Sequence, residues 1–224
     1  DVHSDVDFIV VTNGEVGDED LPALRELHRR LHALDVPWAK HLEGSYVPRA
    51  RLRRVDPSRS PFLYLDNGAS ELEWDNHCNT AVVRWSLRER GVVLAGPDPK
   101  ALVAPVSAAE LRSEALTAIH EYAEWAPDPT KAGGMSQWKQ PYLVLSLCRM
   151  LLMLETGRVV SKRAGGEWAL GALDARWSSL VQRALDDRPD PWGRVFRAAD
   201  PEVAAQTLAF VEYVLDVAAA ATQP

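Results

Sequence analysis

Cysteine is scarce in this sequence, with two among 224 residues. Cys78 and Cys148 both fall in segments whose pattern predicts helix, and neither belongs to a Cys-x-x-Cys pair or to a Cys/His spacing typical of zinc ligands. We therefore expect two buried thiols. A disulfide framework and a structural metal cage are both disfavoured.

Long apolar runs are absent as well. No stretch reaches the roughly 18 to 20 uninterrupted apolar residues that a membrane-spanning helix requires. The opening residues DVHSDVDF lack the basic and then apolar layout of a secretory signal. These absences predict a protein that does not associate with a membrane and that resides in the cytoplasm.

Positive charge is also in deficit, because 25 lysines and arginines stand against 32 aspartates and glutamates, for a net charge of −7. Negative charge opposes the counterion release that drives binding to a phosphate backbone. We therefore do not expect nucleic acid as the main partner. The 46% hydrophobic and 25% charged residues are typical of an ordinary globular chain.

Residues 1–104 alternate short β-branched runs with amphipathic segments, which predicts a mixed β-sheet domain with helices. A run such as Asp7–Thr12, closed by Asn13-Gly14, is typical of a buried strand that ends in a turn. Leucines three and four residues apart predict a helix over about 19–35 that covers the sheet. The expected strands are 7–12, 41–47, 61–65 and 92–95, and the expected helices are 19–35 and 75–89.

Residues 105–224 are helical in pattern throughout, so the expected fold class is α+β, with an all-α bundle as the second domain. Ser107–Glu110 forms a capping-box sequence that opens a helix to about residue 125. A loop from 127 to 134 follows. Apolar stripes then predict a helix that ends at Gly157, shorter helices near 161–173 and 175–187, and a last helix near the C-terminus.

Asp5 and Asp7 form the most informative pair of residues. On a strand, residues i and i+2 point to the same side, so these carboxylates project together, about 6 to 7 Å apart. Two such carboxylates suit Mg²⁺ ions that neutralise nucleotide phosphates. The alternative is a solvated strand start. The four apolar residues that follow favour the metal site, because they predict a central strand beside a core.

Glu43 is a third acid, and it lies in the second expected strand. A carboxylate there would either join the metal cluster or accept a proton from a substrate hydroxyl as a general base. The alternative is an exposed glutamate at a strand edge.

Several segments resemble one family. Ser4–Phe8 (SDVDF) is similar to the second half of the minimal nucleotidyltransferase signature, a Gly-Ser pair followed about ten residues later by Asp-x-Asp. Arg88–Pro97 (RERGVVLAGP) resembles the end of that domain in the streptomycin/spectinomycin adenylyltransferases, which belong to the aminoglycoside nucleotidyltransferases. Leu145–Arg149 (LSLCR), Thr156–Lys162 (TGRVVSK) and Glu167–Ala169 (EWA) resemble their helical C-terminal domain.

The resemblance implies a two-domain enzyme that transfers AMP from ATP to a hydroxyl of a small, cationic, antibiotic-like acceptor and releases pyrophosphate. It places Mg²⁺ on Asp5 and Asp7 and the catalytic base at Glu43. Ser4, Arg149 and Lys162 match residues that contact the nucleotide, and a guanidinium and an ammonium both stabilise phosphate oxygens. The alternatives are a helix-face salt bridge for Arg149 and a solvated lysine for Lys162.

Two features depart from the family pattern. The Gly-Ser pair would precede Ser4 by about ten residues and is not in the sequence, so the N-terminal part of the domain is expected to be missing. Either the sequence is truncated or the chain holds ATP differently. The family's drug-binding acid has no counterpart in Gly134–Gln140, which disfavours streptomycin as the acceptor.

Acceptor contacts are therefore expected from Trp74, Asp75 or Trp138, although tryptophans are more often packing residues. His77 and His120 are interpreted as packing or surface residues of helices. The competing hypothesis for the whole chain is a non-catalytic binding or regulatory module of the same fold. The residues encoded upstream of Asp1 would distinguish the two.

Overall fold

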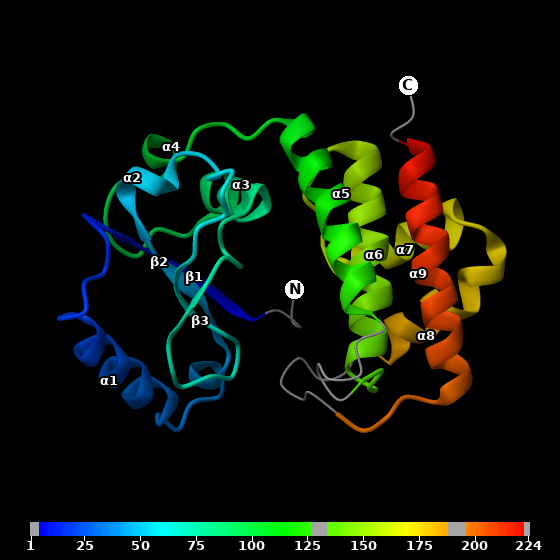
Figure 1. The fold of residues 1–224 in the computed structure, drawn as a ribbon, viewed down its shortest axis with the longest axis horizontal. Helices are drawn as coiled ribbons and strands as arrows, with labels where there is room; N and C mark the ends of the chain where they lie inside the picture. Colours follow the sequence, from blue (N-terminus) through cyan, green and yellow to red (C-terminus); the bar gives the residue numbers. More distant parts are fainter. Residues whose placement is uncertain (1–4, 127–133, 188–195, 222–224) are drawn as a thin grey trace. The chain divides into compact units, whose positions relative to one another are not determined.

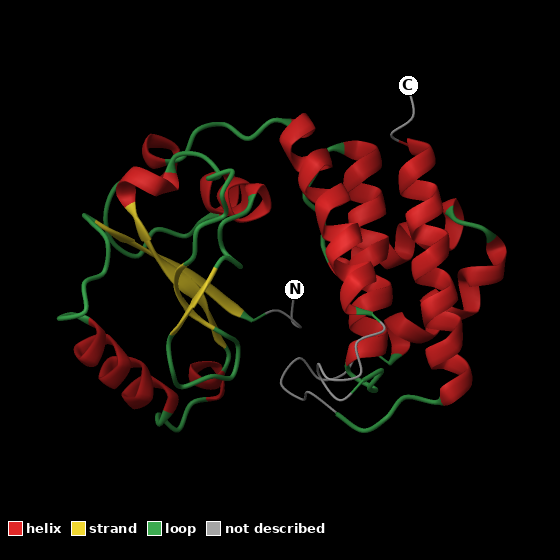
Figure 2. Ribbon diagram, in the orientation of Figure 1, coloured by secondary structure: helices red, strands yellow, loops and turns green. Residues whose placement is uncertain are grey.

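A computed structural model describes residues 5–126, 134–187 and 196–221 (Figures 1 and 2). The chain divides after Val106 into two compact units. We call residues up to Val106 the sheet unit and residues from Ser107 the helical unit. The predicted α+β class is confirmed, because one unit contains the β-sheet and the other consists of packed helices.

The sheet has four strands in the order β1-β2-β3-β4. β1 (Val6–Thr12) pairs in parallel with β2 (Leu42–Pro48), whereas β3 (Phe62–Leu65) and β4 (Glu73–Asp75) continue the sheet in antiparallel fashion. The sheet is therefore mixed, as predicted. The expectation that β1 is central was wrong, since β1 lies at the edge of the described sheet and leaves valines partly exposed.

Each face of the sheet carries its own apolar cluster. Helix α1 (Leu21–His32) covers one face, as predicted, and packs leucines against buried residues of β2 and β3. On the other face, Val47 and Phe62 pack with Leu52 and Val103. Successive strand residues point to opposite faces, so the polar residues that share a face with Val47 and Phe62 are separated from α1 by the sheet.

Two sequence-based expectations for the sheet unit were wrong. Residues 92–95 form no strand, and Val92 and Leu94 are 85% and 95% exposed. β-propensity stabilises a strand only where a neighbouring strand completes the ladder, and these residues have no such partner among those described. Helix α3 (Ala81–Arg90) begins later than expected, because Thr80 caps it by accepting the amide of Val83.

The residues before α3 consequently lie outside it. Asp75 ends β4, and His77 and Cys78 lie in turns rather than in a helix. The Asp75 carboxylate accepts the His77 amide at 2.6 Å, a local bond that closes the turn. The remaining short elements of the unit are η1 (Pro37–Lys40), α2 (Arg49–Leu52) and α4 (Pro99–Leu102).

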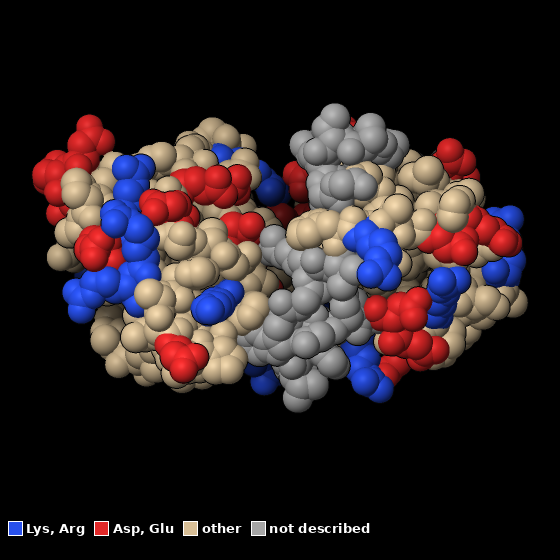
Figure 3. Space-filling model, turned by 90° about the horizontal axis from the view of Figure 1, so that it is seen from below, with Lys and Arg blue, Asp and Glu red and all other residues tan. Residues whose placement is uncertain are grey.

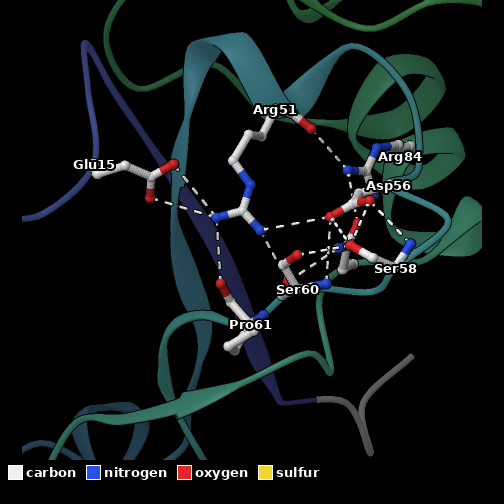
Figure 4. Close-up of polar contacts among 8 residues, drawn as sticks. Glu15, Arg51, Asp56, Ser58, Ser60, Pro61 and Arg84 are labelled. Atoms are coloured by element: carbon white, nitrogen blue, oxygen red, sulfur yellow. Dashed lines mark hydrogen bonds and ion pairs between the residues drawn. The ribbon is translucent and has the colours of Figure 1, made fainter.

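A buried arginine connects α3 to α2 (Figure 4). Arg84 is 2% exposed, and its guanidinium donates to the carbonyls of Leu52 and Arg51 at 3.1 and 3.0 Å and to Asn79 Oδ1 at 3.0 Å. Five donors in a rigid fork let one arginine satisfy several buried acceptors. Arg84 therefore holds α2 and α3 together.

The loop after α2 is organised around Asp56 (Figure 4). Its carboxylate accepts the backbone amide and the hydroxyl of Ser58 and the backbone amide of Ser60. These hydrogen bonds stabilise the charged form and lower the pKa of Asp56 to about 2. Arg51 adds a bond to the carbonyl of Ser60 at 3.0 Å, so the loop is fixed from both sides.

The helical unit is built around α6 (Lys139–Thr156), which packs against α5, α7, α8 and α9. The capping box at Ser107 and Glu110 is confirmed, and α6 ends at Gly157 as predicted, with a left-handed φ of 65°. The expected loop at 127–134 lies almost wholly outside the described residues. The other elements are α5 (Ala108–Trp125), α7 (Lys162–Ala172), η2 (Ala175–Trp177), α8 (Ser178–Asp186) and α9 (Pro201–Ala221).

Helix α9 is long and apolar enough to cross a membrane by length and composition, and it is the one such helix among the described residues. Phe210 and Val214 are fully buried, and the helix packs against α5 and α6. Packing in the bundle therefore accounts for its apolar stripe.

Charged side chains of both signs are interspersed on the face of the molecule shown in Figure 3. Such mixing differs from the continuous basic surface typical of proteins that bind a nucleic-acid backbone.

Candidate active site

Asp7 and Glu43 lie side by side on the sheet. They are register partners on the parallel strands β1 and β2, so their side chains leave the same face. Asp5 precedes β1 by one residue and stands two residues before Asp7, which places it toward the same side. The structure thus brings together the three carboxylates that the sequence singled out. It also confirms that Glu43 belongs to the second strand.

Glu43 is largely enclosed, with a side chain 16% exposed. His77 Nε2 lies 3.1 Å from Glu43 Oε1. The Tyr64 hydroxyl, which reaches in from β3, donates to Asp66 Oδ1 at 3.3 Å and lies near enough to Glu43 to be affected by its charge. Glu43 is therefore contacted by His77, and the Tyr64 hydroxyl lies nearby.

The pKa values of the neighbouring groups reflect the negative charge of this site. Burial, followed by the charges of Glu43 and Asp66, raises the pKa of Tyr64 well above its ordinary value. The hydrogen bond to Glu43 raises the pKa of His77, and burial opposes this shift. Tyr64 is therefore a neutral donor, whereas His77 is drawn toward its cationic form.

Cys78 lies within the same electrostatic environment. Burial raises the pKa of its thiol to about 11, and the charges of Glu43, Asp7 and Asp75 add to the rise. The thiol is therefore protonated at neutral pH. Because three carboxylates act on this one thiol, the acidic groups of β1, β2 and β4 converge near it.

The two acceptor candidates on β4 point in different directions. Asp75 is the register partner of Phe62 and leaves the face that carries Glu43, whereas Trp74 pairs with Leu63 and leaves the face that α1 covers. Trp74 is 48% exposed. The structure therefore places Asp75, and not Trp74, on the same sheet face as the carboxylates.

His77 and Tyr64 are the site residues that the sequence analysis missed. His77 lies in a turn, so its expected place in a helix was wrong, whereas its expected exposure at the surface is confirmed; it also contacts Glu43. Its signal in the sequence is a histidine two residues after an acid, in a polar segment between a strand and a helix. Alternation along its strand could have shown which face of the sheet Tyr64 occupies. It could not have shown that Tyr64 lies near Glu43, because that depends on the order of the strands in the sheet.

The cationic candidates belong to the helical unit. Arg149 lies on α6, and its Nε is buried without a hydrogen-bond partner among the described residues. Lys162 opens α7, and its Nζ lies 4.4 Å from the centroid of the Tyr142 ring. Tyr142 and Arg149 stand seven residues apart on α6 and thus share a helix face. Both candidates therefore lie near the interface between α6 and α7.

Trp138 packs within an aromatic cluster of the helical unit. Its ring stacks on Tyr142 with centroids 5.1 Å apart and meets Trp125 edge-on at 6.3 Å. Tyr142 thus contacts both Trp138 and the ammonium of Lys162. Ser4, the remaining candidate nucleotide contact, lies outside the described residues.

The fold of this chain has a counterpart in a solved adenyltransferase structure. The structure matches the crystal structure of spectinomycin adenyltransferase AAD(9) from Enterococcus faecialis, solved with ATP and spectinomycin. The TM-score is 0.64, with 12% sequence identity over 95% of this chain and 85% of the other. At this identity the match establishes the fold.

The family follows from the sequence of the second half. Residues 101–215 match the model of the family described as "Aminoglycoside adenylyltransferase, C-terminal domain". The chain is 28% identical to an aminoglycoside (3'') (9) adenylyltransferase of Klebsiella pneumoniae, over 95% of this chain and 79% of the relative. It is 24% identical to a spectinomycin 9-adenylyltransferase of Staphylococcus aureus, over 82% and 70%. The chain belongs to the aminoglycoside adenylyltransferase family, whose members are nucleotidyltransferase enzymes.

Proposed function

We propose that this enzyme transfers AMP from ATP to a hydroxyl group of an aminoglycoside-like acceptor, requires Mg²⁺ and releases pyrophosphate. Adenylyl transfer is the activity named for its relatives. The observation that carries the proposal is the register that sets Asp7 beside Glu43, because a carboxylate that bound the metal would then stand next to one that acted as the general base.

The donor set fits Mg²⁺. Asp5 and Asp7 offer carboxylate oxygens, the hard ligands that this ion prefers, and Mg²⁺ is usually held by one or two carboxylates together with substrate phosphates. Among the described residues no cluster of three or more acids, histidines or cysteines forms a cage for a metal. Bound to Asp5 and Asp7, Mg²⁺ would neutralise charge on the phosphates of ATP.

Glu43 would accept the proton of the attacking hydroxyl. The acceptor oxygen then bonds to the α-phosphorus, and the bond from that phosphorus to the bridging oxygen breaks, so that its electrons leave with pyrophosphate. A carboxylate at 16% exposure retains little hydration, which favours direct contact with a hydroxyl. Phosphoryl transfer needs little covalent help, so positioning and electrostatics carry the catalysis.

Arg149 and Lys162 would bind the triphosphate and offset charge on the leaving pyrophosphate. A buried guanidinium nitrogen without a hydrogen-bond partner among the described residues favours an anionic ligand, because unpaired buried donors are costly. Ser4 would contact the nucleotide as the family resemblance implies.

The acceptor would be a small polyhydroxylated molecule with amino groups. Cationic amines are complementary to the acidic face of the sheet, and Asp75 is the candidate residue on that face. Trp138 offers an aromatic surface in the helical unit, and Trp74 remains a candidate on the opposite face of the sheet. Both proposed substrates are small molecules, so we do not expect a nucleic acid as a partner.

The direct test incubates the full chain with ATP labelled at the α-phosphate, Mg²⁺ and a panel of aminoglycosides that includes spectinomycin and streptomycin. We expect labelled AMP on at least one acceptor, one pyrophosphate per transfer, and loss of transfer in EDTA that excess Mg²⁺ restores. Asp7→Ala should abolish turnover. Glu43→Gln should lower kcat and leave ATP affinity unchanged, whereas Asp35→Asn, at an exposed acid of the same unit, should change neither.

Unchanged transfer by Asp7→Ala would refute the metal role, and unchanged turnover by Glu43→Gln would remove the base assignment. A folded chain that binds ATP or an aminoglycoside in calorimetry but transfers no label to any acceptor would support the non-catalytic module.

A further inference from the structure

His77 is held in place by three separate interactions. Its backbone amide donates to Asp75 Oδ1 at 2.6 Å, and its ring lies against the Tyr64 ring with centroids 5.4 Å apart and planes tilted by 31°. Its Nε2 lies 3.1 Å from Glu43 Oε1. Backbone and ring are thus both fixed, and the ring meets the carboxylate through one defined nitrogen.

The two partners differ in exposure. The Glu43 side chain is 16% exposed and the His77 side chain 57%, so the imidazole reaches from the surface onto a mostly enclosed carboxylate. Ion pairs with one exposed member contribute little to folding stability, because water screens them. The contact therefore matters more for the orientation of the Glu43 carboxylate than for the stability of the fold.

We propose that His77 is a positioning residue for Glu43, a role that rests on the proposed function in which Glu43 is the catalytic base. By donating its Nε2 proton to Oε1, His77 fixes the rotamer of the carboxylate. An ionised carboxylate has about four lone-pair sites, so lone pairs remain to accept the proton of the acceptor hydroxyl. The Tyr64 ring lies against the imidazole from the neighbouring strand and supports its orientation.

The hydrogen bond does not depend on the charge of the imidazole. Both the imidazolium and the neutral tautomer with its proton on Nε2 donate from that nitrogen. The charged groups that act on His77 are Glu43, Asp75 and Asp66, and all of them are acidic. These charges favour a protonated ring, and either form keeps the carboxylate aligned.

The test separates positioning from folding by comparing two substitutions. His77→Ala should lower kcat for AMP transfer by about 10- to 100-fold, the effect expected when a reacting group moves by about 1 Å, and leave the KM for ATP within about twofold. His77→Gln retains an N–H donor near the position of Nε2, so we expect it to recover most of the lost kcat. His120→Ala, at an exposed histidine of α5, should match the wild type.

A double substitution tests whether His77 acts through Glu43. In the Glu43→Gln background, His77→Ala should lower kcat by less than about twofold, because the base is already absent. A further loss as large as in the wild type would overturn the proposal. A kcat unchanged in His77→Ala, or no recovery in His77→Gln while its circular dichroism and melting temperature match the wild type, would also overturn it.

Failure of the proposed function is distinguishable from failure of this inference. If the wild type transfers no AMP to any acceptor, the proposed function fails. The contact itself is then read by NMR, in which the histidine resonance that disappears in His77→Ala should shift its titration midpoint to lower pH in Glu43→Gln. A midpoint unaffected by Glu43→Gln would show that the two side chains do not interact.

Discussion

Gly165 of α7 lies directly against the backbone of Arg149 in α6. A methyl group built on Gly165 would come within 2.6 Å of both the Cα and the backbone nitrogen of Arg149. Real contacts do not reach this distance, so the absence of a side chain is what lets the two helices approach each other. The position of Arg149, a candidate ligand of the triphosphate, therefore depends on a glycine in another helix.

Gly165→Ala should consequently destabilise the protein by about 1 to 3 kcal/mol, as overpacking of a tight interface does. We expect the KM for ATP to rise as well, because α6 must shift at Arg149. Gly171→Ala in the same helix is the matched control, since a methyl there meets nothing within 4 Å. It should stabilise by about 0.5 to 1 kcal/mol. Denaturant unfolding of both variants checks this, and equal effects would contradict it.

Arg84→Met should destabilise the sheet unit by about 3 kcal/mol or more. The substitution leaves the carbonyls of Leu52 and Arg51 and the Asn79 side chain without their buried donor, and each unsatisfied group costs about 1 to 3 kcal/mol. Arg90→Met at the exposed end of the same helix should change stability by less than about 0.5 kcal/mol. Urea melts measure both, and similar midpoints would refute the role of Arg84.

Asp56 should contribute to acid stability. Its folded-state pKa of about 2 lies below the ordinary value of 3.8, so its contribution is fully present above pH 3.8 and is lost as the pH falls through about 2. Asp56→Asn should therefore be less stable than the wild type at neutral pH, and the two should converge near pH 2. Unfolding curves at several pH values test this convergence. A constant difference down to pH 2 would contradict it.

Both cysteines should resist alkylation in the folded protein. Burial raises the pKa of Cys78 to about 11 and that of Cys148 to about 12, and both side chains are buried. Thiolate is the reactive form, so almost none is present at pH 8. Mass spectrometry after iodoacetamide should find no adduct in the native protein and two adducts after denaturation. Rapid native labelling of Cys78 would show that the face of the sheet around Glu43 opens.

Local patterns predicted much of this fold. The capping box at Ser107 and the stop at Gly157 were correct, because a cap involves only neighbouring backbone groups. The failures concerned residues 92–95 and the start of α3. A β-branched run forms a strand only when another strand pairs with it, and the cap at Thr80 competes with any earlier helix start.

The sequence by itself determined which residues carry charge and which recur at a spacing of two, so it could single out Asp5, Asp7 and Glu43. Only the tertiary structure decided that Asp7 and Glu43 are register partners, that β1 lies at an edge of the described sheet and that His77 contacts Glu43. Spacing along a strand follows from backbone geometry that every chain shares. The pairing between strands depends on packing that involves the whole unit. The same is true of the turn that brings His77 to Glu43.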